Sequence, residues 1–320
     1  MSKLSKAYPG TDFLDIEFKG SNPLISSLLF EKDSIIILGR EKSGKSILSL
    51  QLMCHLTTQE PFLGKYEVHR PCNVAYVQGE GKIEGTQSNL KMMSKAIDID
   101  PSRYSIHYYP SLPLDTEEGL ASLVSSINSW KKPDVIFLDP LYMMMSGDLI
   151  NNQDARRMVS NIRALSQIYD ATIILVHHGH RPKRNQSGDY IIEGDDSIFG
   201  SFVWKAYPDH ILNLERVKNA KFRRKLTCDT QRMGNIIDSI DLSFIQPDPL
   251  FFEVSTDGRP IDDSVLNAYS NTEPKEIEHI SNFLRIHYDT AWSATKRLKS
   301  SGNITLVNPH EKPHKYLRIR

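Results

Sequence analysis

The stretch GREKSGKS, residues 39–46, constrains the fold of this chain more than any other feature. It follows the aliphatic run SIIIL at residues 34–38, and apolar residues recur after it at helical spacing, at Leu48, Leu52 and Leu56. The run predicts a strand buried on both faces, and the spacing predicts a helix. A glycine-containing loop between a strand and a helix directs main-chain N–H groups and the helix N-terminus toward a phosphate. We therefore expect an α/β fold built around a phosphate-binding loop.

Within this loop each residue type suits a different part of a nucleotide. Gly39 and Gly44 let the main chain turn toward the phosphates, Lys45 would reach the β- and γ-phosphates, and the Ser46 hydroxyl would ligate Mg²⁺. A surface turn that happens to be rich in Lys and Ser is the alternative. We expect ATP with Mg²⁺ to bind here, and the predicted nucleotide-binding residues are Gly39, Arg40, Glu41, Lys42, Ser43, Gly44, Lys45 and Ser46.

Strand-like and helix-like segments alternate up to about residue 245, which predicts a mostly parallel β-sheet. The expected strands are 34–38, 73–78, 104–109, 135–138, 172–177 and 210–215, and the expected helices are 47–57, 83–96, 117–130 and 153–169. Prolines then become frequent between residues 246 and 263, which indicates a boundary. The predicted organisation is an N-terminal segment packing on the core (1–30), an ATPase core (31–245), a linker (246–260) and a C-terminal module (261–320).

Carboxylates follow two of the expected strands. The run DVIFLD ends in Asp139, which suits an acid that holds Mg²⁺ together with Ser46. The run NVAYVQGE places Glu80 just beyond another strand, where it could accept a proton from the water that attacks the γ-phosphate. A solvated loop acid is the alternative for Glu80, and Glu84 is a possible substitute. The predicted catalytic residues are Lys45, Glu80 and Asp139.

The expected strand TIILVH runs into the paired histidines His177 and His178. A histidine at such a point is often purely structural. Two adjacent imidazoles at the phosphate end of a sheet can also donate a hydrogen bond to the γ-phosphate, or relay its loss to the next loop. We predict a γ-phosphate sensor at this pair, and the sequence does not choose between the two side chains.

Taken in order, the blocks GREKSGKSILSLQL, VAYVQGEGK, DVIFLDPLYMM and TIILVHHGHR resemble RecA-like P-loop ATPases, and in detail the RepA-type hexameric replicative helicases of plasmids and phages. The resemblance covers roughly residues 20–245. It implies a ring of six subunits, with ATP bound between neighbours and single-stranded DNA in the central channel. It also matches Lys45 and Ser46 to the phosphate loop, Glu80 to the catalytic base, Asp139 to the magnesium-associated acid and the two histidines to the histidine motif.

One departure from the family concerns the cation supplied by a neighbouring subunit. Family members usually carry Arg-Gly-Ser after the histidine loop, whereas this chain has Phe199-Gly200-Ser201. The basic cluster at residues 218–225 is a substitute, because a cation reaching a neighbour's γ-phosphate would neutralise developing charge. The alternative is a solvated basic hairpin. The candidates are Lys218, Arg223 and Arg224.

Two regions are candidates for contact with DNA. The segment between His178 and Gly200 carries Arg181, Lys183 and Arg184 and would face the channel, where cations follow a phosphate backbone without reading bases. A surface loop that touches nothing is the alternative.

The second region is the C-terminal module, which reads as three helices (262–270, 274–286, 290–300) and a hairpin (304–307, 315–319), similar to a winged helix-turn-helix. Residues 291–320 hold seven Lys or Arg and a single acid, Glu311, which suits duplex DNA, although a protein-docking role is equally open. The residues placed on or beside the recognition helix and wing are Ser293, Thr295, Lys296, Arg297, Lys299, His314, Lys315 and Arg318.

Overall composition narrows the setting without naming a partner. The 39 basic and 39 acidic residues give a formal net charge of zero, so global basicity does not indicate nucleic acid. No apolar run approaches twenty residues and the N-terminus has no apolar signal core, which predicts a cytoplasmic protein that does not enter membranes. Three scattered cysteines indicate reduced thiols.

The features together favour an ATP-dependent motor on single-stranded DNA that forms a homo-oligomer, with a hexamer expected. A RecA-like regulatory ATPase of the KaiC or RadA kind, which controls assembly without unwinding, is the alternative. A DNA-binding regulator whose ATPase sets its oligomeric state is a third reading.

Overall fold

A nine-stranded sheet organises the part of the chain that the computed structural model describes, residues 9–10, 22–179, 198–217, 220–231, 239–246, 249–255, 260–284, 287–300, 302–310 and 312–319. The strand order is β11-β10-β9-β8-β3-β7-β6-β4-β5. The bounds are β3 (Ser34–Gly39), β4 (Val74–Gln78), β5 (Tyr104–Tyr108), β6 (Val135–Asp139), β7 (Thr172–His178), β8 (His210–Arg216), β9 (Arg223–Gln231), β10 (Ile240–Ile245) and β11 (Phe251–Val254).

The strands from β8 to β5 are parallel, so their carboxyl ends meet along one edge. Strand β7 lies between β3 and β6, and in register Gly39 pairs with His178. Gln78 pairs with Asp139 on the next pair of strands. The predicted α/β fold class with a mostly parallel sheet is confirmed, and this edge gathers the loop, acid and histidine segments.

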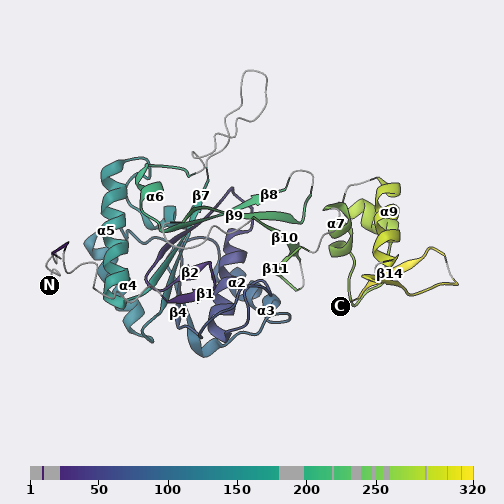
Figure 1. Ribbon diagram of the computed structural model, residues 1–320, viewed down its shortest axis with the longest axis horizontal. Helices are drawn as coiled ribbons and strands as arrows, with labels where there is room; N and C mark the ends of the chain where they lie inside the picture. The colour runs from purple at the N-terminus through teal and green to yellow at the C-terminus, as the bar shows by residue number, and fades with distance from the viewer. Residues whose placement is uncertain are drawn as a thin grey trace, which may run out of the picture.

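Helices cover both faces of the sheet because successive residues of its buried strands point to opposite sides. Ile35 and Ile37 face the cluster that contains α2, whereas Ile36 and Leu38 face the cluster that contains α5. Figure 1 shows α2 and α3 on one side and α4, α5 and α6 on the other. The bounds are α2 (Lys45–Thr58), α3 (Ile83–Met93), α4 (Glu117–Asn128), α5 (Asn152–Tyr169) and α6 (Val203–Ala206), with short 3-10 helices η1 (Pro101–Arg103) and η2 (Leu141–Met144).

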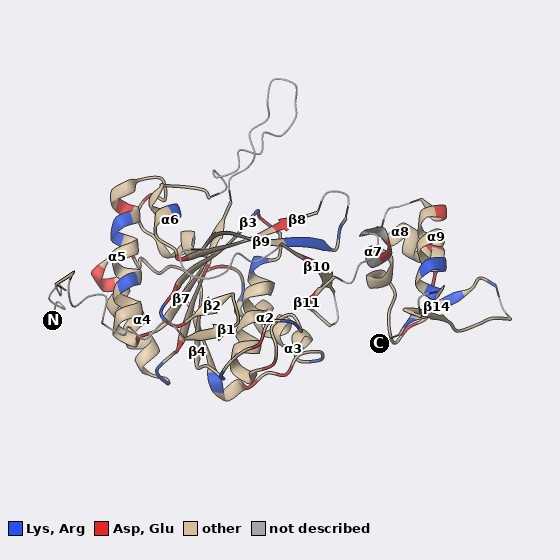
Figure 2. Cartoon of the chain, viewed as in Figure 1, with Lys and Arg blue, Asp and Glu red and all other residues tan. Residues whose placement is uncertain are grey.

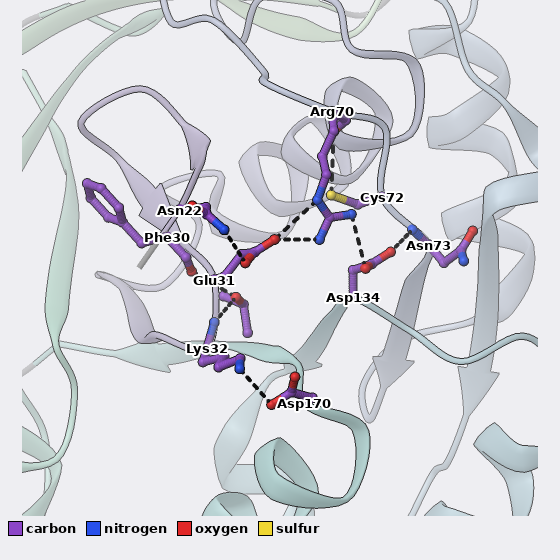
Figure 3. A network of polar contacts seen from close by, with 10 residues as sticks. Asn22, Phe30, Glu31, Lys32, Arg70, Cys72, Asn73, Asp134 and Asp170 are labelled. Carbon is purple, nitrogen blue, oxygen red and sulfur yellow. Dashed lines mark hydrogen bonds and ion pairs between the residues drawn. The ribbon is translucent and has the colours of Figure 1, made fainter. Parts of the chain in front are cut away.

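The described part of the N-terminal segment packs at the amino ends of the strands. Its two short strands, β1 (Pro23–Ile25) and β2 (Leu29–Phe30), pair with each other, and their leucine and isoleucine side chains are buried in the core. Ion pairs and hydrogen bonds also join this segment to the loops before β4 and β6 (Figure 3). Arg70 donates to Glu31 at 2.9 Å and pairs with Asp134 at 3.1 Å, and Asp134 accepts from the Asn73 N–H at 2.8 Å. Residues before β3, β4 and β6 are therefore held together.

An antiparallel extension, β9 to β11, widens the sheet beyond β8. Strand β11 lies inside the segment 246–260, which the prolines led us to expect as a linker, so that expectation is wrong for Phe251–Val254. These residues belong to the sheet because Phe252 is buried in the core and its main chain makes two hydrogen bonds with the Gln51 amide of α2, at 2.6 and 2.7 Å.

The C-terminal module consists of three helices and a small sheet with its own core. Its elements are α7 (Pro260–Ala268), α8 (Ile277–Leu284), α9 (Tyr288–Ser300), β12 (Lys275–Glu276), β13 (Ile304–Leu306) and β14 (Lys315–Arg318), and the strand order is β12-β14-β13. The module meets the β8–β9 hairpin where the Lys221 ammonium lies 4.8 Å from the ring of Phe283, and Arg318 pairs with Glu253 at 3.6 Å. Among the described residues, no helix has the length and apolar character needed to cross a bilayer.

Candidate nucleotide site

The phosphate loop leaves β3 at Gly39 and enters α2 at Lys45, and its backbone requires glycine at both ends. A Cβ on Gly39 would lie 2.5 Å from the Leu214 carbonyl oxygen, and a Cβ on Gly44 would lie 2.8 Å from the Phe252 ring. Gly44 also has φ +105°, in the left-handed region that glycine adopts most readily. The loop is thus packed against its own sheet at these two positions, with no room there for a side chain.

The first turn of α2 differs from the starts of α4 and α5. Thr116 caps α4 by accepting from the Gly119 N–H, and Asn151 caps α5, whereas α2 has no side-chain cap and no acid in its first turn. Helix N-termini leave N–H groups without intrahelical partners, and these groups bind anions. The start of α2 therefore fits a phosphate.

Lys45 points back into the strand ends and is only 6 % exposed. Its ammonium donates to the carbonyls of Gly39 at 2.9 Å and Arg40 at 3.0 Å, and it lies 3.3 Å from Nδ1 of His178. Burial lowers the pKa of Lys45 to about 8, although the charges of Asp139 and other nearby acids oppose the shift. The cation is therefore already desolvated and held where a triphosphate would neutralise it.

Asp139 ends β6 beside the first residues of α2. Its Oδ1 accepts from the Ser46 hydroxyl at 3.2 Å, and its Oδ2 accepts from the hydroxyl of Tyr76, which is fully buried on the neighbouring strand β4. Burial raises the pKa of Asp139, while the two hydroxyls and Lys45 lower it. Hydroxyl and carboxylate oxygens are the ligands that Mg²⁺ prefers. The pair Ser46 and Asp139 therefore fits a magnesium ion shared with phosphates, and Tyr76 holds the carboxylate in place.

Glu80 lies just beyond β4, and the side chain of Gln78 fixes its backbone by donating to the Glu80 carbonyl at 2.8 Å. Burial raises the pKa of Tyr142 to about 12, and a hydrogen bond with Glu80 adds to this rise. The Glu80 carboxylate is thus next to the Tyr142 hydroxyl. It is also close enough to Lys45 for its charge to oppose the lowering of the Lys45 pKa. Glu84, the possible substitute, lies in the first turn of α3.

The two histidines point to opposite sides of β7. The His178 ring contacts Lys45 and lies 5.1 Å from the Tyr142 ring, whereas His177 is fully buried, with Nε2 at 2.8 Å from the Phe199 carbonyl. Burial lowers the pKa of His178, and the charge of Lys45 lowers it further. Because an ammonium has no acceptor, Nδ1 of His178 accepts and Nε2 carries the proton. His178 therefore presents a neutral N–H donor in the site.

Two arginines hold the phosphate loop from its own chain. Arg216, at the end of β8, donates to the Lys42 carbonyl, and Arg224, at the start of β9, donates to the Ser43 carbonyl at 2.6 Å. Burial lowers the pKa of Arg224 to about 10, with the Arg216 charge adding to the shift. The β8–β9 hairpin reaches the loop because β8 pairs with β3. The carbonyls of Lys42 and Ser43 are thereby held by the hairpin.

These contacts correct the expectation that Arg223 or Arg224 reaches a neighbouring subunit. Arg224 is 4 % exposed and its donors are used by carbonyls of its own chain, and Arg223 is 8 % exposed. Arg224 is packed under the phosphate loop, and Arg223 is buried in the same hairpin, so neither side chain projects from it. Lys218, the remaining candidate, lies outside the described residues.

The residues expected to contact DNA are dispersed. Arg181, Lys183 and Arg184 lie outside the described residues. On α9, the Arg297 guanidinium donates to both carboxylate oxygens of Asp262, so this candidate is already engaged within its own module, and Thr295, placed on the helix as expected, is buried. In the same module Arg318 is engaged with Asn267 and Glu253. The three lysine candidates of this module, Lys296, Lys299 and Lys315, are exposed.

Three members of the site carry no signal in the sequence that points to their role. Tyr76 reads as an ordinary buried strand residue, Tyr142 as part of a loop after Asp139, and Arg216 as a charge at a strand end. The pairing of β4 with β6 brings Tyr76 to Asp139, and the pairing of β8 with β3 brings Arg216 to the loop. Only the strand order shows these contacts.

Comparison with known proteins places this geometry in a family. Two solved structures are similar in outline, each with a TM-score of 0.49: a KaiC-like protein, PH0186, from the hyperthermophilic archaeon Pyrococcus horikoshii OT3 (13 % identity, 78 % of this chain, 96 % of that chain) and the RadB recombinase (16 % identity, 71 % and 92 %). No curated protein matches. A family model for an AAA domain matches residues 8–184, more than half of the sequence and the whole of the site from the phosphate loop to His178. The chain therefore belongs to this AAA domain family.

Proposed function

We propose that this protein hydrolyses MgATP and uses the reaction to move along single-stranded DNA as a ring-forming motor. The observation that carries the hydrolytic part is the meeting of Lys45, Ser46, Asp139, Glu80 and His178 at the carboxyl edge of four strands. A cation, N–H and O–H donors and two carboxylates thus gather at the uncapped start of α2. This is the charge arrangement that phosphoryl transfer to water requires.

Each residue has a distinct part in the proposed reaction. Glu80 accepts a proton from water as the water oxygen bonds to the γ-phosphorus, and the bond to the β–γ bridging oxygen breaks to release ADP. Lys45 and the N–H of His178 neutralise the charge that develops on the γ-phosphate oxygens. Ser46 and Asp139 would hold the magnesium ion, which draws charge from the β- and γ-phosphates.

Coupling to DNA is proposed through the segment that follows β7. The Gly179 N–H donates to the Gly39 carbonyl at 3.2 Å, and the Phe199 N–H donates to the His178 carbonyl at 3.2 Å. Gly179 and Ile198 also form a bridge, so both ends of the segment 180–197 start at the sensor histidine. A change at His178 on loss of the γ-phosphate would act on both ends at once, and the segment's cations Arg181, Lys183 and Arg184 would follow the DNA backbone.

A ring of subunits, expected to be a hexamer, completes the proposal. Subunit boundaries next to the nucleotide would supply a cation in trans, for which Lys218 is the remaining candidate from the 218–225 cluster. The C-terminal module, with its winged-helix-like arrangement, would orient or recruit the ring on DNA.

The test measures ATP hydrolysis with and without single-stranded DNA, together with strand displacement on tailed duplexes. A motor predicts strong stimulation by single strands, displacement dependent on Glu80, and a six-membered assembly on sizing. Hydrolysis indifferent to DNA, with no displacement at either polarity of tail, would refute the motor. That result would instead support a regulatory ATPase whose nucleotide state controls assembly.

A further inference from the structure

Helix α9 carries an exposed stripe of aromatic and cationic side chains on the face that its own module leaves open. Tyr288, Trp292, Lys296 and Lys299 follow one another at steps of four, four and three residues, so they lie along one side of the helix. Tyr288 is 48 % exposed and Trp292 is 46 % exposed. We call these four residues the α9 stripe.

The side of α9 next to the stripe is the one that packs into the module. Ala291, Ala294, Thr295 and Leu298 are buried in the core of the module, against α7, α8 and the small sheet. That face is complete without the stripe. An exposed tryptophan and tyrosine beside each other on one helix face therefore need another reason.

The two charged residues of the α9 stripe are both basic, and both lie in its C-terminal half. The Lys296 ammonium lies 5.4 Å from the centroid of the Trp292 ring, and neither Lys296 nor Lys299 has an ion-pair partner within the described part of the chain. Strand β14 also carries basic residues, coloured blue in Figure 2. By contrast, the nearby Arg297 is neutralised by Asp262, so the two free ammonium groups are set apart from the structural arginine.

We propose that the α9 stripe is a binding site for single-stranded DNA, in which bases stack on Trp292 and Tyr288 and phosphates contact Lys296 and Lys299. Flat aromatic rings beside cations bind unpaired strands without sequence preference, since every base offers a face for stacking. A duplex hides its base faces, and its phosphates alone would leave the two rings unused. A protein partner would require an acidic counterpart to both lysines, which makes it the less direct fit. The proposal rests on the proposed function only in its choice of DNA over RNA.

The test uses the full chain and a fluorescent readout. An oligothymidine strand is titrated into protein without nucleotide, with tryptophan emission followed, because stacking on Trp292 quenches it. Trp292→Phe should abolish most of the quench and keep the affinity, since a ring remains. Trp292→Ala should weaken binding about tenfold. Lys296→Ala with Lys299→Ala should lower the slope of log affinity against log salt by about 1.4, as expected for two lost phosphate contacts on a single strand.

A matched control comes from α3 and the turn that follows it, where Lys91 and Lys95 are exposed and far from the stripe in sequence. Their double alanine variant should leave both the quench and the salt slope unchanged. Affinity that Trp292→Ala leaves unchanged, or a duplex of equal length that competes better than the single strand, would overturn the proposal. Tighter binding of the matching RNA strand would overturn the assignment to DNA.

The outcome is separable from that of the motor. Lys45→Ala abolishes hydrolysis, yet adding oligothymidine to this variant should still quench the tryptophan emission from the α9 stripe. Conversely, ATP hydrolysis that DNA stimulates, together with a DNA affinity that Trp292→Ala leaves unchanged, would support the motor and overturn the proposal for the α9 stripe.

Discussion

The buried ammonium of Lys45 makes nucleotide affinity depend on pH in a range where most lysines stay charged. Burial lowers the pKa of Lys45 to about 8. Lys45 loses its proton as pH rises through this value. The charged form, which a triphosphate needs, therefore declines above pH 8 and accounts for nearly all of the Lys45 side chains below pH 7. Bound phosphates favour the charged form, so binding takes up a proton at high pH.

The size of the effect follows from that pKa. Lys45 is about nine-tenths protonated near pH 7 and about one-tenth protonated near pH 9. If only the charged form binds well, MgATP affinity should fall about tenfold between these values, and about 0.9 proton should be taken up per nucleotide at the upper one.

Isothermal titration calorimetry in two buffers of different ionisation enthalpy measures both quantities. Lys45→Arg is the matched control, because a guanidinium stays charged over the whole range. Its affinity should be weaker at neutral pH, owing to the different shape, but flat between pH 7 and pH 9. A wild-type affinity that is equally flat, with no proton uptake, would show that Lys45 is not the desolvated group described here.

Three further changes test the site and its support. Tyr76→Phe removes the donor to the buried Asp139 carboxylate, and kcat should fall about tenfold with little change in folding, as steady-state ATPase assays would measure. Gly44→Ala puts a side chain at φ +105° and 2.8 Å from a ring, so nucleotide affinity should fall at least about tenfold in the same titrations. Asp33→Asn removes one of the partners of His210: burial lowers the pKa of His210, but hydrogen bonds to Asp33 and Cys228 together outweigh it and bring the pKa to about 9. Because this pKa is raised on folding, its stabilisation is complete below about pH 6.5 and is lost as pH rises through about 9. Urea unfolding should therefore show a deficit of about 2 kcal/mol near pH 6 that shrinks toward pH 10.

Two of these changes have a control variant, and the third is checked by its pH dependence. Tyr104→Phe alters a tyrosine on β5 away from Asp139 and should leave kcat intact. Gly64→Ala imposes similar strain at φ +65° with nothing within 4 Å of the new Cβ, so it should cost stability without changing nucleotide affinity. Equal losses of kcat in both tyrosine variants, or equal losses of affinity in both glycine variants, would mean that the effects are general. An Asp33→Asn deficit that stays constant with pH would exclude His210 as its source.

The parallel half of the fold was predictable because its strands and helices are regular in pattern. Runs such as SIIIL are almost entirely apolar. Helices α4 and α5 begin after residues of the types that cap helices, Thr116 and Asn151. The antiparallel extension was not, because its strands mix charged and apolar residues and are flanked by prolines. Strand β11 is short and gains its place through Phe252 and the distant Gln51.

The site was predictable in its members on strand ends but not in the contacts between strands. Adjacent residues of a strand point to opposite faces, so His177 and His178 are equivalent in the sequence until the neighbours of β7 are known. The basic cluster showed that cations were present without showing where they point. Arg224 turns under its own phosphate loop because β8, the partner of β9, pairs with β3, a relationship that no local pattern encodes.

The β8–β9 hairpin serves two neighbours at once, and this limits how its sequence can vary. Surface hairpins generally accept insertions and deletions, because little depends on their length. Here Arg216 and Arg224 must both reach the phosphate loop while Lys221 meets Phe283 of the C-terminal module. Adding or removing one residue would shift one set of contacts relative to the other, so a length change in this turn should impair nucleotide binding and loosen the attachment of the module together.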